Sequence, residues 1–142
     1  MIIMAIDLGN SRTGISLCDK SEILSYPLCT LEEKNKCELI NKIYELSKKH
    51  SVESIVLGFP KNMNGSIGEK AEEIIDFRES LLKKVKINVI LWDERLTTVS
   101  AQRNFVQMNI NSKKSRKIID AASACLILEN YLEYKHKKPI KS

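Results

Sequence analysis

The chain has 142 residues, of which 43% are hydrophobic and 29% charged, a composition typical of one soluble globular domain. Its apolar runs are well short of the ~20 residues that a membrane helix needs. No basic segment precedes a long apolar stretch as it would in a secretory signal. The net charge of +5 and the pI of about 9.0 permit a polyanionic partner without proving one, because lysine-rich surfaces often serve solubility alone.

The cysteines and histidines give little indication of a thiolate or imidazole metal site. The four cysteines form no C-x-x-C pair, and three of them stand in apolar-patterned segments. His50 and His136 both lie in polar, lysine-rich surroundings. We therefore expect reduced core thiols in a cytoplasmic protein.

Three short strands are expected at the start of the chain. Residues 2–7 form a continuous apolar run of the kind that is buried on both faces of a sheet. Residues 12–19 and 22–28 are predicted as two further strands, and the polar turn at 19–21 indicates a hairpin between them. The chain therefore begins with an antiparallel meander.

Helices and strands then alternate. Thr30 and Glu33 have the spacing of a capping box, which predicts a helix from this point to about Lys49. The remaining elements are expected as a buried strand at 54–60, an amphipathic helix at 69–84, a strand at 86–94, a helix from Thr97 or Thr98 to about Met108 and a last helix at 118–134. The turn-rich segment 60–68 and the basic segment 111–117 are predicted as loops.

This order of elements predicts an α/β fold. A three-stranded antiparallel meander followed by alternating helices and strands gives a mixed five-stranded sheet with helices on both faces. No internal repeat or low-complexity linker divides the chain, so residues 1–134 are expected to form a single domain. Residues 135–142 are expected to be a basic, disordered tail.

Four carboxylates stand at the ends of predicted apolar elements. Asp7 closes the first strand, Asp93 and Glu94 close the strand at 86–94, and Asp120 stands in the first turn of the last helix on an apolar face. In open α/β sheets the active crevice lies beyond the C-terminal ends of the parallel strands. A buried carboxylate without a partner is costly, so these acids need an explanation.

Each acid also has a simpler interpretation. Asp7 could cap the turn that follows it, the pair at 93–94 could form a salt bridge with Arg95, and Asp120 could meet the helix dipole. Three acids at element ends without matching buried bases favour a hard-cation site instead, and carboxylate oxygens suit Mg²⁺ or Mn²⁺. Such ions could support phosphodiester hydrolysis. Strand alternation does not choose between Asp93 and Glu94, because both faces of their strand are apolar.

Four segments of the chain occur in a familiar order: AIDLGNSRTGISLCD, VLGFPKNMNGSIGEKAEEIIDF, WDERLTTVSA and IIDAASACLILENYL. They resemble the YqgF/RuvX family, whose members are described as Holliday junction resolvases and as pre-16S rRNA nucleases. The resemblance runs from Met1 to about Tyr134, with one departure at Phe59, where a small aliphatic residue is common. It implies a ribonuclease H-like fold, in agreement with the predicted order of elements.

The resemblance also implies site residues. Asp7, Glu94 and Asp120 match the three catalytic, metal-binding acids of the family, and Asp93 is kept as the alternative to Glu94. Several other positions match expected substrate contacts, namely Arg12, Arg95, Gly65, Gly68, Lys113, Lys114, Arg116 and Lys117. Basic side chains near the last acid would hold the phosphate backbone without reading its sequence.

The activity implied by the resemblance is that of a metal-dependent endonuclease with a two-metal mechanism. Its substrate would be structured nucleic acid, either the 5′ end of the 16S rRNA precursor or, alternatively, branched DNA. The protein would act as a monomer or a homodimer. Two rival hypotheses are an actin-like ATPase relative, which would need two such domains, and a non-catalytic nucleic-acid-binding module, which would have no use for three clustered acids.

Overall fold

The computed structural model describes residues 1–9, 11–59, 69–93 and 112–137. For residues 59, 69–71, 93, 112–120 and 137 it describes the backbone alone. The helix predicted from Thr97 or Thr98 and the loop predicted at 60–68 lie outside the described residues.

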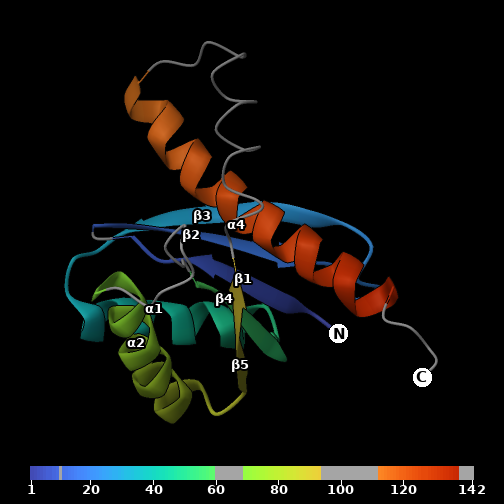
Figure 1. Ribbon diagram of the computed structural model, residues 1–142, viewed down its shortest axis with the longest axis horizontal. Coiled ribbons are helices and arrows are strands. Elements are labelled where there is room, and N and C mark those ends of the chain that lie inside the picture. The colour runs from blue at the N-terminus through green and yellow to red at the C-terminus, as the bar shows by residue number, and fades with distance from the viewer. Residues whose placement is uncertain (10, 60–68, 94–111, 138–142) are drawn as a thin grey trace.

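A mixed five-stranded sheet forms the centre of the molecule (Figure 1). The strands lie in the order β3-β2-β1-β4-β5, where β1, β2 and β3 are antiparallel neighbours and β4 and β5 run parallel to β1. Their bounds are Ile3–Asp7 for β1, Arg12–Cys18 for β2, Ser25–Glu32 for β3, Ser54–Phe59 for β4 and Asn88–Asp93 for β5. The predicted meander, the parallel strands and their number are confirmed.

Helices cover both faces of this sheet, as predicted. Helices α1 (Lys36–Lys49) and α2 (Glu69–Val85) pack on one face, and α4 (Ser112–Lys137) crosses the other (Figure 1). No helix among the described residues is long and apolar enough to cross a membrane.

The pleat of β1 divides its side chains between these two layers. Met4 and Ile6 are fully buried in the cluster that contains the apolar side chains of α1 and α2. Ile3 and Ala5 point the other way and pack with Ile127 of α4. Burying such a side chain contributes about 1.5–3 kcal/mol, so the register of the central strand is firmly set.

The predicted start of the first helix is wrong. Thr30 lies in β3, where it pairs with Gly14 of β2, and the helix is capped by Asn35 instead. The Asn35 side-chain oxygen accepts a hydrogen bond from the Glu38 amide at 3.1 Å. The backbone ladder with β2 extends β3 to Glu32, and this pairing overrides the local capping signal of Thr30 and Glu33.

The last helix is longer than predicted at both ends. Its backbone is helical from Ser112, so the segment 111–117 that was predicted as a loop is helical from its second residue. It continues to Lys137, three residues beyond the predicted end at Tyr134. Residues 135–137, which were assigned to the tail, therefore belong to the helix, and 138–142 lie outside the described residues.

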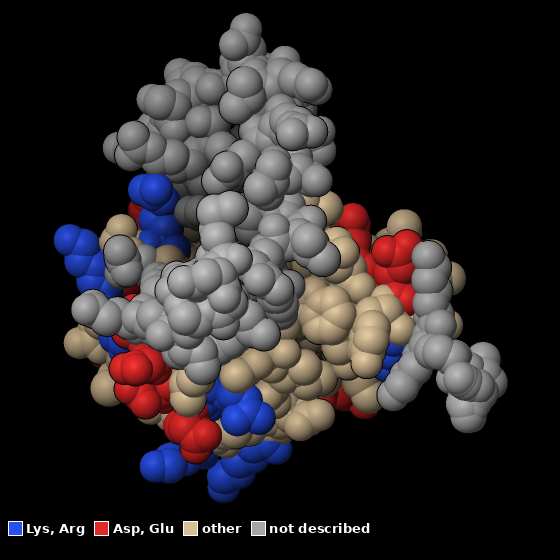
Figure 2. Space-filling view, in the orientation of Figure 1, with Lys and Arg blue, Asp and Glu red and all other residues tan. Residues whose placement is uncertain are grey.

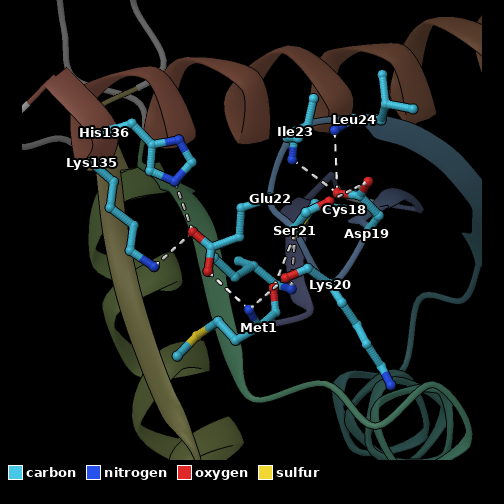
Figure 3. A network of polar contacts seen from close by, with 11 residues as sticks. Met1, Cys18, Asp19, Lys20, Ser21, Glu22, Ile23, Leu24, Lys135 and His136 are labelled. Carbon is cyan, nitrogen blue, oxygen red and sulfur yellow. Dashed lines mark hydrogen bonds and ion pairs between the residues drawn. The ribbon is translucent and has the colours of Figure 1, made fainter.

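One carboxylate ties the far end of α4 to the β2–β3 turn. Glu22 has a φ of 60°, an unusual conformation for glutamate. Its carboxylate accepts hydrogen bonds from the Lys135 ammonium at 2.9 Å and from the Met1 amino group at 3.0 Å, and it lies 3.0 Å from His136 Nε2 (Figure 3). Desolvation by burial raises the pKa of Glu22, but its hydrogen bonds with Lys135, Met1 and His136 outweigh it and lower the pKa to about 2. The C-terminal end of α4 is thereby fixed beside the N-terminal end of β1.

Replacing Glu22 with glutamine is expected to lower the free energy of unfolding at pH 7 by up to about 3 kcal/mol. The folded-state pKa of Glu22 lies below its ordinary value of 4.5, so this stabilisation is complete above that value and is lost as the pH falls toward 2. Urea unfolding of both proteins at pH 7 and pH 3 should show a difference that shrinks by more than half at pH 3. Glu72→Gln, on the exposed side of α2, is the control and should change stability by less than about 0.5 kcal/mol.

The four cysteines are buried to different degrees. Cys18 is buried, Cys29 and Cys125 are half-buried, and Cys37 is exposed; none of them is in a disulfide. Desolvation by burial raises the pKa of the Cys18, Cys29 and Cys125 thiols, so these groups are neutral and chemically quiet.

Candidate active site

The central strand presents Asp7 at its C-terminal end. Asp7 follows Ile3 and Ala5 at a spacing of two, which places it on the sheet face covered by α4. It is the last residue of β1, is only half-buried, and pairs across the sheet with Gly14 of β2. A strand that is buried along its whole length therefore ends in a carboxylate with access to solvent.

The chain turns sharply after Asp7, and Gly9 makes this turn possible. A Cβ atom at Gly9 would collide with the backbone carbonyl oxygen of Arg12. Only glycine leaves room for the two backbone segments to approach this closely. The turn returns the chain into β2 beside Asp7.

Arg12 is brought to the same end and the same face of the sheet. In β2, Cys18 packs in the α4 cluster and Ser16 pairs with Ala5, so alternation places Gly14 and Arg12 on the α4 face as well. Arg12 is the first residue of β2 and lies at the end where β1 finishes. The predicted acid and the predicted phosphate-binding base of the first motif are thus neighbours in the fold.

Two charged neighbours of Arg12 were missed by the sequence interpretation. Glu32 is the cross-strand partner of Arg12 in the β2–β3 ladder. The second is Lys34, which lines a recess of about 230 Å³ together with Ser11, Arg12 and Glu32. The signal was present in the sequence, since extending the β2–β3 pairing past Thr30 would have placed Glu32 opposite Arg12.

The other parallel strands finish at the same edge of the sheet. Gly58 pairs with Trp92 and Phe59 pairs with Asp93, where both strands end. Trp92 lies on the α4 face and packs edge-to-face against Tyr131, with ring centroids 5.5 Å apart. The α4 face of β5 is therefore identified by Trp92, and Glu94, which follows two residues later in the sequence, lies outside the described residues.

Asp120 is part of helix α4, where the structure describes its backbone alone. The helix starts at Ser112, so the expected first-turn position is wrong and Asp120 stands in the third turn. Ala124 and Ile127, at helical spacing from position 120, are fully buried. The C-terminal end of α4 is held at Glu22, and the helix crosses the sheet from there until its N-terminal half projects beyond the sheet (Figure 1).

The remaining predicted site residues cannot be placed by their side chains. Arg95, Gly65 and Gly68 lie outside the described residues. The positions of Lys113, Lys114, Arg116 and Lys117 are helical in backbone, in the first two turns of α4. Among the described residues there is no group of three potential metal-ligating side chains. Of the three predicted ligands, Asp7 is the one whose side chain the structure describes.

Comparisons with known proteins concern the chain as a whole. The family model RuvX, described as Holliday junction resolvase, matches residues 1–134. A relative from Caldanaerobacter subterraneus subsp. tengcongensis is 39% identical over 134 residues, covering 94% of this chain and 96% of the relative. A relative from Clostridium acetobutylicum is 39% identical over 132 residues, covering 93% and 98%. Both carry the provisional name of pre-16S rRNA nuclease.

Similarity to solved structures concerns the fold. T. thermophilus RuvC in complex with a Holliday junction substrate superposes with a TM-score of 0.61 at 10% identity, covering 97% of both chains. The fowlpox virus resolvase in complex with Holliday junction DNA gives a TM-score of 0.56 at 13% identity, covering 95% of this chain and 99% of that one. The sheet and its helical layers are therefore those of a ribonuclease H-like fold.

Proposed function

The chain belongs to the RuvX family of Holliday junction resolvases, and on that premise we propose that it is a nuclease that hydrolyses phosphodiester bonds in structured nucleic acid. The observation that carries this proposal is the placement of Asp7 with Arg12. Asp7 ends the central strand as a half-buried carboxylate, and Arg12 begins the neighbouring strand at the same edge and on the same face of the sheet, the edge where α/β proteins bind ligands.

We propose that Asp7, Glu94 and Asp120 share a divalent cation, Mg²⁺ or Mn²⁺. The donor set fits such an ion, because it consists of carboxylate oxygens and its first member is fixed at the end of a buried strand. Three carboxylates gathered at one site would repel one another without a cation between them. When bound, the cation would activate a water molecule and offset the charge that develops on the leaving oxygen.

The structure gives a reason to choose Glu94 over Asp93. Asp7 and Trp92 lie on the α4 face of the sheet, the face across which the helix bearing Asp120 runs. Strand alternation puts position 93, the last of β5, on the face covered by α1 and α2, opposite to Trp92. This supports the proposal that Glu94 rather than Asp93 serves the site.

Basic residues would hold the substrate. Arg12 faces the same side as Asp7, and its guanidinium would offset the charge that grows on the phosphate oxygens during in-line attack by water. Arg95 follows Glu94 in the sequence and would act in the same place. Lys113, Lys114, Arg116 and Lys117 stand within two turns of Asp120 and would contact the phosphate backbone on either side.

Of the two substrate classes, the RNA precursor is favoured. Relatives that match this chain from end to end carry the provisional name of pre-16S rRNA nuclease, and the activity assigned here is cleavage at the 5′ end of that precursor. The second candidate is branched DNA, which the description of the family as Holliday junction resolvase supports, and symmetrical cuts would then require a homodimer.

The half-buried cysteines, proposed to be reduced thiols, are compatible with a cytoplasmic enzyme.

The experiment is cleavage by purified protein of a 16S rRNA precursor fragment and of a four-way DNA junction, each with Mg²⁺, with Mn²⁺ and with a chelator. The proposal predicts cleavage that needs the cation and leaves 5′-phosphate ends, with the RNA cut faster. Faster cleavage of the junction would establish the second candidate, and absence of cleavage of either substrate would overturn the nuclease assignment.

A further inference from the structure

The C-terminal ends of α1 and α2 meet in a group of lysines far from Asp7. The last turn of α1 contains Lys48 and Lys49, the last turn of α2 contains Lys83 and Lys84, and Lys86 follows directly. All five side chains are exposed, and within the described part of the chain none of them takes part in an ion pair. We refer to these five residues as the lysine patch.

Two members of the lysine patch converge on one aromatic ring. The Lys48 ammonium lies 5.3 Å and the Lys84 ammonium 4.9 Å from the centroid of the Tyr44 ring. Lysines at helix C-termini commonly do no more than complement the helix dipole. Here two like charges from different helices approach the same half-buried ring, and their mutual repulsion would be relieved by an anion lying between them.

The location of the lysine patch decides which anion fits. Helices α1 and α2 each return the chain to the start of the following parallel strand, so their C-terminal ends lie at the edge of the sheet opposite to Asp7. Helix α1 has 14 residues, which corresponds to a length of about 21 Å. Blue surface gathers along the lower edge of the molecule in Figure 2, below the position of α2 in Figure 1.

We propose that the lysine patch is a second contact for the phosphate backbone of a long structured nucleic acid that is cut at the Asp7 site; this inference rests on the proposed function. Nucleic acid places phosphates at about 3.4 Å per strand, so about six base pairs span no more than the length of α1. Asp7 lies on the α4 face and the lysine patch on the face of α1 and α2, so a nucleic acid that reaches both must be longer than this and must bend around the edge of the sheet. The lysine patch therefore makes the enzyme favour substrates with long helical arms.

The test measures binding rather than cleavage. In an Asp7→Asn background, Lys48→Glu together with Lys84→Glu is compared with the parent on RNA hairpins with stems of about 4 and about 20 base pairs. The long hairpin should bind at least ~10-fold more weakly to the double variant, and the slope of log affinity against log salt should fall by about 2. The short hairpin should bind equally to both proteins.

Two controls separate this contact from overall charge. Lys48→Arg with Lys84→Arg keeps both cations at Tyr44 and should retain the affinity of the parent. Lys20→Glu with Lys36→Glu makes the same change in net charge elsewhere and should weaken binding of the long hairpin far less. An equal loss of affinity in this control, or an equal effect of the Lys48→Glu, Lys84→Glu change on both hairpins, would overturn the inference. Unchanged binding by the Lys48→Glu, Lys84→Glu variant would overturn it too, and would point to an acidic protein as the partner of the lysine patch.

The inference and the proposed function can fail separately. If the wild-type protein cleaves its substrate and the double variant binds both hairpins like its parent, the nuclease assignment stands and the second contact is refuted. If the wild-type protein cleaves nothing but the length-dependent difference in binding is present, the nucleic-acid surface stands and the nuclease assignment is refuted.

Discussion

Replacing Asp7 with asparagine is expected to reduce cleavage by at least about 10²-fold while leaving the fold intact. The substitution keeps the size of the side chain and removes one of the negative charges that would hold the cation. The backbone pairing of Asp7 with Gly14 is unaffected, so the sheet should form as before. Cleavage of the favoured substrate at saturating Mg²⁺ or Mn²⁺ gives the loss, and circular dichroism confirms that the variant is folded.

Thermal unfolding separates loss of chemistry from loss of structure. Without divalent cation, the Asp7→Asn protein should unfold at the same temperature as the wild type or at a higher one, because repulsion among the three proposed acids is reduced. With Mn²⁺ present, only the wild type should gain stability by ligand binding. A folded variant that cleaves as fast as the wild type would refute the assignment of Asp7.

Glu94→Gln is expected to reduce cleavage by at least about 10²-fold, whereas Asp93→Asn should reduce it by less than about 3-fold. The reason is the pleat of β5, which puts position 93 on the face opposite to Trp92 and Asp7, so that Asp93 is not expected at the proposed site. The two residues are adjacent in the sequence and carry the same charge. Their comparison therefore tests the orientation of the strand end, with each variant acting as the control for the other.

The outcomes are distinct in kinetics and stability. Loss of activity in Asp93→Asn with retention in Glu94→Gln would show that the site uses the other acid of the pair. Equal loss in both variants, with an unfolding temperature equal to that of the wild type, would show that both carboxylates serve the site. Both results would contradict the choice of Glu94 alone.

The strands and helices with strong apolar patterns could be predicted from the sequence. The run at 2–7 became β1, and the segment at 69–84 became α2 with its ends shifted by no more than one residue. These elements are set by burial, because Ile6 and Leu81 are completely enclosed. Such apolar patterns can be read from the sequence without knowing which elements pack against them.

Element boundaries set by tertiary pairing could not be predicted in the same way. Thr30 has the composition of a helix cap, but its backbone is used by the ladder with Gly14, and the cap function passes to Asn35. The segment 111–117 was predicted as a loop because of its charge. It contains neither glycine nor proline, and lysine and arginine are good helix formers, so nothing in it prevents the helix from starting at Ser112.

The candidate site follows the same division. Asp7 could be recognised from the sequence because a carboxylate directly after five apolar residues is costly to bury unless it has a partner. The face on which position 93 lies depends on which face α4 covers, and this is set by contacts between β1 and α4, which are far apart in the chain. Glu32 beside Arg12 depended on the true length of β3.

The most direct test of the central claim is the number and affinity of Mn²⁺ ions bound per chain, measured by equilibrium dialysis for the wild type and four single variants. The account predicts that Asp7→Asn, Glu94→Gln and Asp120→Asn each weaken Mn²⁺ binding by at least about 10-fold, while Asp93→Asn binds as the wild type does. Wild-type affinity in folded Glu94→Gln or Asp120→Asn protein would contradict the claim that these three acids share one cation site.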